Sequence, residues 1–380
     1  MKIGIFTCNY KPLINGLSSS IEIFSHQFRQ KGHEVFVFAP QYPGHCEREE
    51  GVFRFPSLRA PTHHQYTLPL PFSRRMEAVV FRLGLDLVHA QHPFLLGKFA
   101  LRAARRLDLP LVFTHHTLYE AYAHYVPLLS GFAARSAIRR STSFANRADL
   151  VIAPTRGLKA ILEGRGVRTR IEVVPTGVEM AEEAKTTIAP EDLGIPSSAK
   201  ILLTVGRLAR EKNLDFLLSA FSRLATDFPD WYLILVGEGD ERARLEAWVK
   251  KRGLEPRVRF QGAQPRSQLS RFYRGAHLLL FSSLSEAQGL VIVESMAQGL
   301  PVVALRSFAV QDLIDDGVNG YLAEGLEMFL DRVRDLLLHE ERRRSFSEKA
   351  REKAQQFLAP AMAAKMLSLY QGLLEGRRSR

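Results

Sequence analysis

The sequence contains very little cysteine and no long hydrophobic run. Its 380 residues include only Cys8 and Cys46, too few for a disulfide framework or a cysteine-ligated zinc site, which favours a reducing compartment. No stretch approaches the roughly 18 uninterrupted apolar residues that a membrane-spanning helix needs. Residues Met1–Ile5 lead directly into a strand-like run rather than a secretory leader. These absences disfavour a secreted protein, a membrane-spanning protein and a zinc protein.

The net charge is positive and unevenly distributed. The formal charge is +12 at pH 7; Met1–Pro175 holds 23 Lys and Arg against 12 Asp and Glu, whereas the remainder holds 29 against 28. A one-sided excess of this kind favours a polyanionic partner, either a nucleic acid or an anionic membrane surface. The alternative explanation is an arginine-rich composition that merely reflects a GC-rich genome, although such a bias would extend over both halves.

Short apolar runs alternate with helix-like segments along both halves. Because such strands are apolar throughout and separated by helices, they predict parallel sheets covered on both faces. The expected fold class is α/β, with two doubly wound Rossmann-like domains in tandem, joined by a polar linker at 179–198. The predicted strands are Lys2–Thr7, Glu34–Ala39, Leu85–His89, Leu109–Thr114, Leu150–Ala153, Ile171–Val174, Ile201–Val205, Trp231–Val236, Val258–Gln261, Leu278–Ser282 and Pro301–Leu305.

Two glutamates flank the predicted start of a helix in the second half, in the sequence SEAQGLVIVESMA at 285–297. Gly289 lets backbone N–H groups approach an anion, and a helix N-terminus favours a phosphate. Glu294, about one turn into the helix, is placed to accept hydrogen bonds from a ribose diol, and Glu286 from sugar hydroxyls. This arrangement suits a sugar nucleotide; the alternative is an ordinary acid near a helix start.

A basic loop, GRLAREKN at 206–213, follows the predicted strand Ile201–Val205. Arg207 and Lys212 leave the carboxyl end of that strand, where a diphosphate needs compensating charge. Asn213 is expected to cap the next helix. Basic loop residues are usually solvated, so the loop alone is weak evidence for a diphosphate site. Its position in the same half of the chain as the two glutamates strengthens that interpretation.

Together these segments resemble a known family. The loop at 206–213 and the pair Glu286-x7-Glu294, followed by AQGLPVVA at 297–304 and DGVNGYL at 316–322, are similar to the retaining GT-B glycosyltransferases of the glycogen-synthase-like superfamily. The resemblance spans nearly the whole chain. It implies two Rossmann-like domains facing each other across a donor cleft, with residues 1–178 binding the acceptor and 199–358 the nucleotide sugar. The last helix, 359–380, would pack back on the N-terminal domain.

The same resemblance implies roles for individual residues. Arg207 and Lys212 would bind the donor diphosphate and stabilise the leaving group, while Glu286 would hold the donor sugar. Glu294 would hold the ribose. The set expected to bind the donor is Gly16, Arg207, Lys212, Gly289, Leu290, Val291 and Glu294.

Two loops in the first half complete the implied site. Gly16 corresponds to a glycine of the family that approaches the donor phosphates, although the family often has a double glycine here and a plain Asn-Gly turn is the alternative. His116, after the strand Leu109–Thr114, resembles the family's single His before a Thr and is suited to the sugar or the acceptor. Its neighbour His115 is expected to point the opposite way, and a buried structural role is the alternative for each. The expected catalytic set is His116, Arg207, Lys212 and Glu286.

The segment Thr117–Pro127 resembles the corresponding loop of diacylglycerol glucosyltransferases and related lipid-modifying members. Its aromatic and histidine side chains would form an amphipathic entrance for the acceptor. Arginines at roughly helical spacing between Phe132 and Phe144 predict a basic amphipathic helix at an anionic membrane, and Phe72–Arg75 adds to the same field. A solvated surface helix is the alternative. The residues assigned to acceptor and membrane are Tyr119, Tyr122, His124, Tyr125, Arg135, Arg139 and Arg140.

The predicted reaction moves a hexose, expected to be glucose, from a nucleotide sugar such as UDP-glucose to a membrane lipid such as 1,2-diacylglycerol. The resemblance implies retention of configuration. Because the sequence contains no Asp-x-Asp pair, we expect no metal clamp on the diphosphate, and we expect no tightly bound cofactor.

The enzyme is expected to be cytoplasmic and peripheral on the inner face of the membrane. A soluble or polysaccharide acceptor is the alternative. A nucleic-acid-binding protein is a distant alternative, and we expect no nucleic-acid partner, because no nucleic-acid-binding motif accompanies the basic half.

Overall fold

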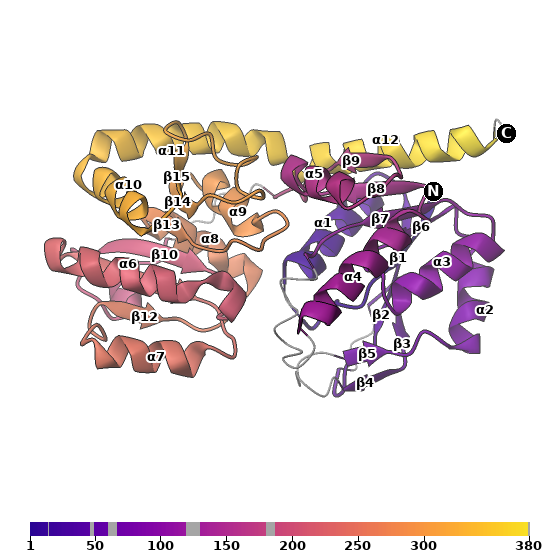
Figure 1. The fold of residues 1–380 in the computed structure, drawn as a ribbon, viewed down its shortest axis with the longest axis horizontal. Coiled ribbons are helices and arrows are strands. Elements are labelled where there is room, and N and C mark those ends of the chain that lie inside the picture. Colours follow the sequence, from indigo (N-terminus) through magenta and orange to yellow (C-terminus); the bar gives the residue numbers. More distant parts are fainter. Residues whose placement is uncertain (14, 46–48, 60–66, 119–129, 180–186, 379–380) are drawn as a thin grey trace. The chain divides into compact units, whose positions relative to one another are not determined.

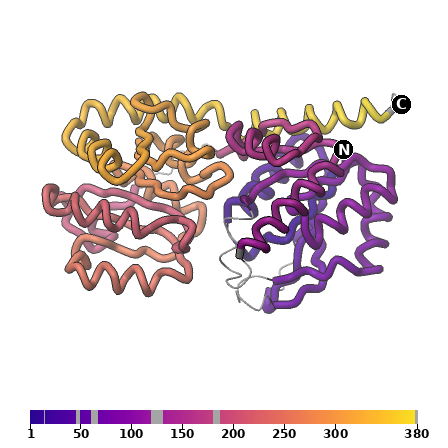
Figure 2. The backbone as a smooth tube through the Cα atoms, viewed as in Figure 1, coloured from indigo at the N-terminus to yellow at the C-terminus, as the bar shows by residue number. Residues whose placement is uncertain are grey.

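The computed structural model describes the chain except residues 14, 46–48, 60–66, 119–129, 180–186 and 379–380 (Figure 1). It comprises two compact units: unit 1 is Met1–Gly177 with Ala359–Arg380, and unit 2 is Val178–Leu358. The chain leaves unit 1 once and returns to it for the last helix, a course that can be followed in Figure 2. None of the described helices is both long and apolar enough to cross a membrane.

Unit 1 contains a parallel sheet of seven strands in the order β3-β2-β1-β6-β7-β8-β9. The order reverses between β1 and β6, which pair directly, so the loops after these strands leave the same edge of the sheet. A separate antiparallel pair is formed by β4 and β5. The bounds are β1 (Lys2–Phe6), β2 (Glu34–Pro40), β3 (Val52–Phe55), β4 (Ser57–Arg59), β5 (Thr67–Pro69), β6 (Leu87–Ala90), β7 (Leu111–Thr114), β8 (Leu150–Ala153) and β9 (Ile171–Val173).

Helices cover both faces of this sheet. On one face, α1 packs beside α12, and Phe28 of α1 meets Tyr370 of α12 edge to face. On the other face, aromatic side chains such as Phe6, Phe99 and Phe113 form a second buried layer. The helices are α1 (Gly16–Gln30), α2 (Arg74–Leu83), α3 (Leu96–Arg106), α4 (Ser130–Ala145), α5 (Arg156–Gly164) and α12 (Ala359–Arg378).

The start of α1 excludes the plain Asn-Gly turn that the sequence left open as an alternative at Asn15 and Gly16. The Asn15 side chain accepts hydrogen bonds from the backbone N–H groups of Leu17 and Ser18, and the Ser18 side chain accepts from Asn15, which is a capping box. Asn15 and Gly16 therefore begin a helix rather than forming a plain Asn-Gly turn. The helix start depends on the polar side chains of Asn15 and Ser18, which a pattern of apolar residues does not reveal.

Unit 2 repeats the architecture with six parallel strands in the order β12-β11-β10-β13-β14-β15, reversing between β10 and β13. Residues 187–198, in the predicted linker, belong to this unit, and Leu193 and Ile195 are buried in its core. The strands are β10 (Lys200–Val205), β11 (Trp231–Val236), β12 (Val258–Phe260), β13 (Leu278–Phe281), β14 (Val302–Leu305) and β15 (Gly320–Ala323). The helices are η3 (Pro190–Leu193), η4 (Arg210–Lys212), α6 (Leu214–Asp227), α7 (Arg242–Lys251), α8 (Arg266–Gly275), α9 (Leu290–Ala297), α10 (Leu326–Leu338), α11 (Glu340–Ala354) and η5 (Gln355–Phe357).

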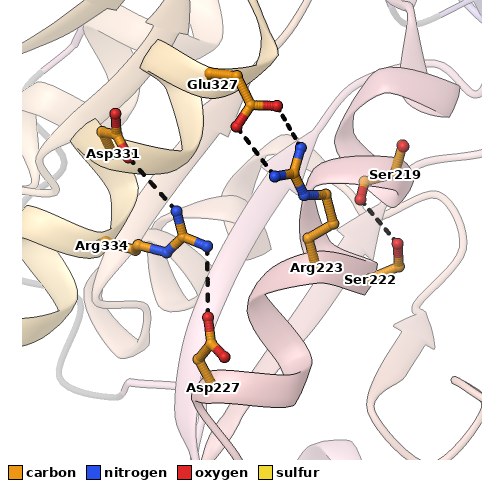
Figure 3. Close-up of polar contacts among 7 residues, drawn as sticks. All are labelled: Ser219, Ser222, Arg223, Asp227, Glu327, Asp331 and Arg334. Atoms are coloured by element: carbon orange, nitrogen blue, oxygen red, sulfur yellow. Dashed lines mark hydrogen bonds and ion pairs between the residues drawn. The ribbon is translucent and has the colours of Figure 1, made fainter.

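Ion pairs connect α6 and α10 on the surface of unit 2 (Figure 3). The Arg223 guanidinium donates to both carboxylate oxygens of Glu327, at 2.5 and 3.0 Å, and Arg334 reaches Asp227 of α6 at 3.4 Å. These side chains are exposed, so water and salt screen them and they add little to stability. The helices are held by the apolar residues beneath, such as Leu217 and Phe329, which are buried.

Candidate active site

Two loops of unit 2 meet where the strand order reverses. The first follows β10 and includes η4, and the second follows β13 and leads into α9. The Ser282 hydroxyl donates to the Lys212 carbonyl at 2.7 Å, and the Asn213 amide donates to the Ser282 carbonyl at 3.4 Å. Ser283 donates to the Glu211 carbonyl at 3.2 Å. The paired strands and these hydrogen bonds hold the two loops together.

Asn213 behaves differently from the sequence-based expectation. Its backbone is left-handed, with φ 54°, and its side chain makes no capping hydrogen bond to α6. The side chain instead contacts the loop after β13. The prediction of a helix cap was wrong because asparagine also tolerates the left-handed conformation, and here the residue is used for the turn between η4 and α6.

Two cationic side chains of the first loop, Arg207 and Lys212, are paired with carboxylates. Lys212 forms an ion pair with Glu286, which lies on the second loop, and Arg207 forms one with Glu211. The side chains of Lys212 and Glu286 are 24% and 23% exposed, so solvent still reaches the pair. Three of the residues selected from the sequence, Arg207, Lys212 and Glu286, therefore lie on the two joined loops, and two of them are in contact.

Close backbone packing next to this loop explains glycines that the sequence analysis did not single out. A Cβ on Gly237 would lie 1.9 Å from the Gly206 carbonyl oxygen, and one on Gly239 would lie 2.2 Å from the Leu208 carbonyl oxygen. Only glycine permits this approach. The available signal was the Gly-x-Gly immediately after the strand Trp231–Val236, which marks a turn packed against a neighbouring backbone.

Gly289 immediately precedes α9 in the left-handed conformation, with φ 82°, and no side chain caps the helix. Leu290 and Val291 form its first turn, where backbone N–H groups precede the intrahelical hydrogen-bond pattern and carry the positive end of the helix dipole. The predicted helix start at Gly289 is confirmed. The loop before this turn carries Glu286. The start of α9 is therefore only a few residues along the chain from the ion pair between Glu286 and Lys212.

Glu294, one turn into α9, is held by two side chains of α8. Its Oε1 lies 3.0 Å from Arg266 Nη2, and its Oε2 accepts a hydrogen bond from the Tyr273 hydroxyl at 3.1 Å. Burial raises the pKa of Glu294, while Arg266 opposes the rise. Burial likewise raises the pKa of Tyr273, so it remains a donor. The sequence analysis missed Arg266 and Tyr273, because their contact with Glu294 depends on the packing of two helices.

In unit 1, His115 and His116 lie on opposite faces at the end of β7. His115 is buried and its ring meets Phe113 edge to face, whereas His116 Nε2 lies 2.6 Å from the Gln91 side-chain oxygen. Burial lowers the pKa of His115 to about 3. Gly16 is the exposed first residue of α1.

The residues assigned to acceptor and membrane are only partly described. On α4, Arg135, Arg139 and Arg140 are exposed, and so is Phe132. Among the residues that the structure describes, no group of three or more His, Cys, Asp or Glu side chains is arranged to hold a metal ion. Tyr119, Tyr122, His124 and Tyr125 lie outside the described residues.

Both halves of the sequence match known families. Residues 14–182 match Glycosyltransferase Family 4, and residues 185–353 match Glycosyl transferases group 1. The alpha-monoglucosyldiacylglycerol synthase of Streptococcus pneumoniae is 30% identical over 86% of this chain and 76% of its own length. The chain therefore belongs to the GT-B glycosyltransferases of group 1. The family and the fold class predicted from the sequence motifs are confirmed.

Two further comparisons describe its neighbours. The GDP-mannose-dependent alpha-mannosyltransferase of Mycobacterium tuberculosis is 29% identical over 100% of this chain and 98% of its own. Among solved structures, HepE of Anabaena in complex with UDP-glucose superposes with a TM-score of 0.77 at 21% identity, covering 97% of this chain and 99% of that one. The first is similar in sequence, and the second shows the shared fold.

The buried histidines of unit 1 predict a loss of stability in acid. Burial lowers the pKa of His89 and of His115 to about 3 and that of His92 to about 4, whereas an unfolded chain protonates histidine near pH 6.5. The unfolded state therefore binds more protons below that pH. Each ring lowers the free energy of unfolding by about 2 kcal/mol between pH 7 and pH 5. Urea denaturation at the two pH values measures the effect.

Replacing one ring separates this effect from general acid sensitivity. His115→Gln should flatten the dependence of stability on pH by about one proton, and His26→Gln, at an exposed position on α1, should leave it unchanged. An unaltered pH dependence in His115→Gln would contradict the assignment of a neutral buried ring.

Proposed function

We propose that this glycosyltransferase transfers a hexose, with retention of anomeric configuration, from a nucleotide sugar to a membrane glycerolipid. The observation that carries the proposal is the contact between the basic loop after β10 and the acidic loop after β13, made by Lys212 and Glu286. A cation for a phosphate and a carboxylate for sugar hydroxyls lie side by side, which matches the two chemically different parts of a nucleotide sugar.

In the proposed complex, Arg207 and Lys212 bind the diphosphate. Each has a carboxylate partner now, Glu211 and Glu286, so the phosphate oxygens take over interactions that these cations already make. Glu286 is then available to accept hydrogen bonds from the donor sugar. The exchange replaces one charged partner by another and leaves neither cation without a counter-charge.

The start of α9 supplies the remaining donor contacts. The backbone N–H groups at Gly289, Leu290 and Val291 would bind a phosphate or a sugar oxygen, helped by the helix dipole. Glu294, oriented by α8, would accept hydrogen bonds from the ribose. UDP-glucose is our choice of donor, supported by the solved complex of HepE with that molecule.

The proposed reaction requires charge stabilisation more than a strong base. The acceptor hydroxyl forms a bond to the anomeric carbon while the bond from that carbon to the diphosphate oxygen breaks. The departing phosphate takes the proton of the acceptor on the same face of the sugar. Arg207 and Lys212 stabilise the negative charge that develops on the phosphate, so we propose that no divalent metal is needed. His116 is assigned to a hydroxyl of the donor sugar or of the acceptor.

The lipid acceptor is supported by the relative from Streptococcus pneumoniae, whose name describes glucosyl transfer to diacylglycerol. The name of the mannosyltransferase relative specifies GDP-mannose and supports a second candidate with a different donor. A soluble or polysaccharide acceptor is the alternative to the lipid. A panel of nucleotide sugars, offered with diacylglycerol-containing vesicles and with lipid-free acceptors, distinguishes the two. Determining the anomeric configuration of the product tests retention.

We further propose that unit 1 binds the cytoplasmic face of an anionic membrane. Among the described residues of unit 1, the most exposed large apolar side chains are Phe72, Phe132 and Leu58, which are 79%, 67% and 61% exposed. Arg102 holds Phe72, with the guanidinium 5.1 Å from the ring centre and a hydrogen bond to the Pro71 carbonyl. Exposed aromatic rings among arginines suit the boundary between headgroups and acyl chains. Unit 1 also exposes arginines on three helices: Arg74, Arg75 and Arg82 on α2, Arg105 and Arg106 on α3, and Arg135, Arg139 and Arg140 on α4.

Removal of either member of the ion pair should strongly impair transfer. Lys212→Ala or Glu286→Ala should each lower kcat/KM at least a hundredfold, on the order of 3 kcal/mol of transition-state stabilisation. Lys251→Ala, at an exposed position on α7, is the control. Steady-state kinetics with the preferred donor measures the effect. Near-normal turnover in either variant would show that the active site does not lie on these two loops.

The environment of Glu294 predicts a pH dependence of donor binding. Only the ionised carboxylate accepts two hydrogen bonds from a ribose, so affinity should fall as the pH falls through the raised pKa of Glu294. Arg266→Met removes the cation that opposes this rise, and the loss of affinity should then begin at a higher pH. Arg271→Met, on the same helix, should not move the profile. Calorimetric titration of the nucleoside diphosphate between pH 5 and pH 8 tests this; coincident profiles for the wild type and Arg266→Met would be incompatible with the assignment.

Membrane binding should depend on the arginines of α4. The double substitution of Arg139 and Arg140 by Glu should weaken binding to anionic vesicles at least about thirtyfold, because each basic residue near such a surface contributes about 1 kcal/mol and the new carboxylates are repelled. Hydrolysis of the donor in the absence of lipid should be preserved. Arg344→Glu on α11 of unit 2 is the control. Vesicle co-sedimentation at several salt concentrations measures binding, and equal loss of binding and hydrolysis would indicate a structural role instead.

A further inference from the structure

Two hydrogen bonds connect the ends of β6 and β7 on one face of the unit 1 sheet. His89 Nε2 lies 2.7 Å from the Thr114 hydroxyl, and His116 Nε2 lies 2.6 Å from Gln91 Oε1. Because successive side chains of a strand alternate between faces, His89 and Gln91 share a face, and so do Thr114 and His116. His89 and Thr114 are buried, and so is Gln91, which is 4% exposed.

The hydrogen bond between His89 and Thr114 and the one between His116 and Gln91 differ in the further contacts of each histidine ring. The His89 ring continues to α12, where the Tyr370 hydroxyl lies 2.6 Å from its Nδ1. Both nitrogens of His89 are thus occupied by hydroxyl groups inside the core, and this ring serves the packing of α12. His116 is less buried than His89, and its Nε2 is occupied by a side chain that does not belong to the proposed donor-binding set.

The chemistry of the Gln91 contact determines where the proton on His116 lies. The atom of Gln91 that faces the ring is the amide oxygen, which can only accept a hydrogen bond. His116 Nε2 must therefore carry the hydrogen. A neutral imidazole with hydrogen on Nε2 has its lone pair on Nδ1, so Nδ1 is the nitrogen that can accept a hydrogen bond from a hydroxyl group.

The surroundings keep the ring neutral. Burial holds the pKa of His116 well below its usual range, and the neighbouring rings that add to this lowering are His89 in β6, His92 after β6 and His115 after β7. The cavity beneath His116 has a volume of about 10 Å³, room for a single water. Its described lining includes Ser20 of α1, Pro154, which follows β8, and Met366 of α12, and contains no Asp, Glu, Lys or Arg.

We propose that Gln91 is a positioning residue for sugar transfer: it fixes His116 in the Nε2–H tautomer and directs the Nδ1 lone pair at a hydroxyl group of a bound sugar or acceptor. His116 then accepts a hydrogen bond from that hydroxyl and does not donate one. The effect on turnover rests on the proposed function. The assignment of the tautomer does not, because it concerns the protein without substrate.

The test is nitrogen-15 NMR of the histidine rings in the full chain, with His116→Gln identifying the His116 signals. In the wild type, His116 should show a protonated Nε2 and an unprotonated Nδ1. Gln91→Leu removes the acceptor and should abolish this tautomer preference. Gln91→Glu keeps an oxygen acceptor and adds negative charge, so the ring should become protonated at a higher pH than in the wild type. If Gln91→Leu does not fold, Gln91→Glu still tests the proposal.

The adjacent connection supplies a matched control. Tyr370→Phe removes the hydroxyl group on His89 and should lower stability while leaving the His116 signals unchanged. With hexose transfer as the readout, Gln91→Leu should lower kcat about tenfold with little change in the KM of the donor. Gln91→Glu should shift the acid limb of the pH profile upward.

The outcomes separate the two proposals. Hydrogen on Nδ1 of His116 in the wild type, or an unchanged tautomer in Gln91→Leu, would overturn the role of Gln91 even if the wild type transfers a hexose. Absence of transfer from every nucleotide sugar, with the expected tautomer observed, would instead overturn the proposed function and leave the assignment of the His116 proton intact.

Discussion

The ion pair between Lys212 and Glu286 is the interaction on which the proposed chemistry depends, and the sheet of unit 2 makes it possible. Direct pairing of β10 with β13, at the point where the strand order reverses, brings together two loops that are about 70 residues apart in sequence. Glycines that tolerate backbone contact at 237 and 239 then support the first loop. A side chain at either position would displace the loop that carries Arg207.

Unit 1 uses the same topology with a different kind of polar group. Its strand ends present neutral histidines, His89 and His116, rather than ion pairs. Neutral rings suit a buried strand end, because burying a charge costs far more than burying a hydrogen-bonded imidazole. The two units therefore differ in the polar groups at their strand ends, with ion pairs in unit 2 and neutral rings in unit 1.

The apolar strands could be predicted because a run of apolar residues within one short segment is enough to identify each of them. The predicted strand Trp231–Val236, for example, has the same bounds as β11. The strands β3, β4, β5 and β15 were missed although equally short strands, such as β9 and β12, were predicted, so strand length alone does not decide which strands can be predicted from the sequence. The contact of Glu294 with Arg266 and Tyr273 could not be predicted either, because it arises only when α8 packs on α9. Asn213 shows a further limit: one residue type serves both as a cap and as a left-handed turn, and only the backbone decides between them.

The numbers of cationic and acidic residues in each half of the sequence limit how many ion pairs that half can form. The second half has nearly as many carboxylates as cations, and its arginines find partners, as Arg223 does with Glu327 and Arg244 with Asp215. The first half has 23 cations and 12 carboxylates within Met1–Pro175, so at least eleven cations cannot be matched one to one inside that segment. Uncompensated charge of one sign repels itself and weakens a fold. That cost is tolerable when the cations stand at the surface, as on α4, and it becomes an advantage when an external anion supplies the missing charge.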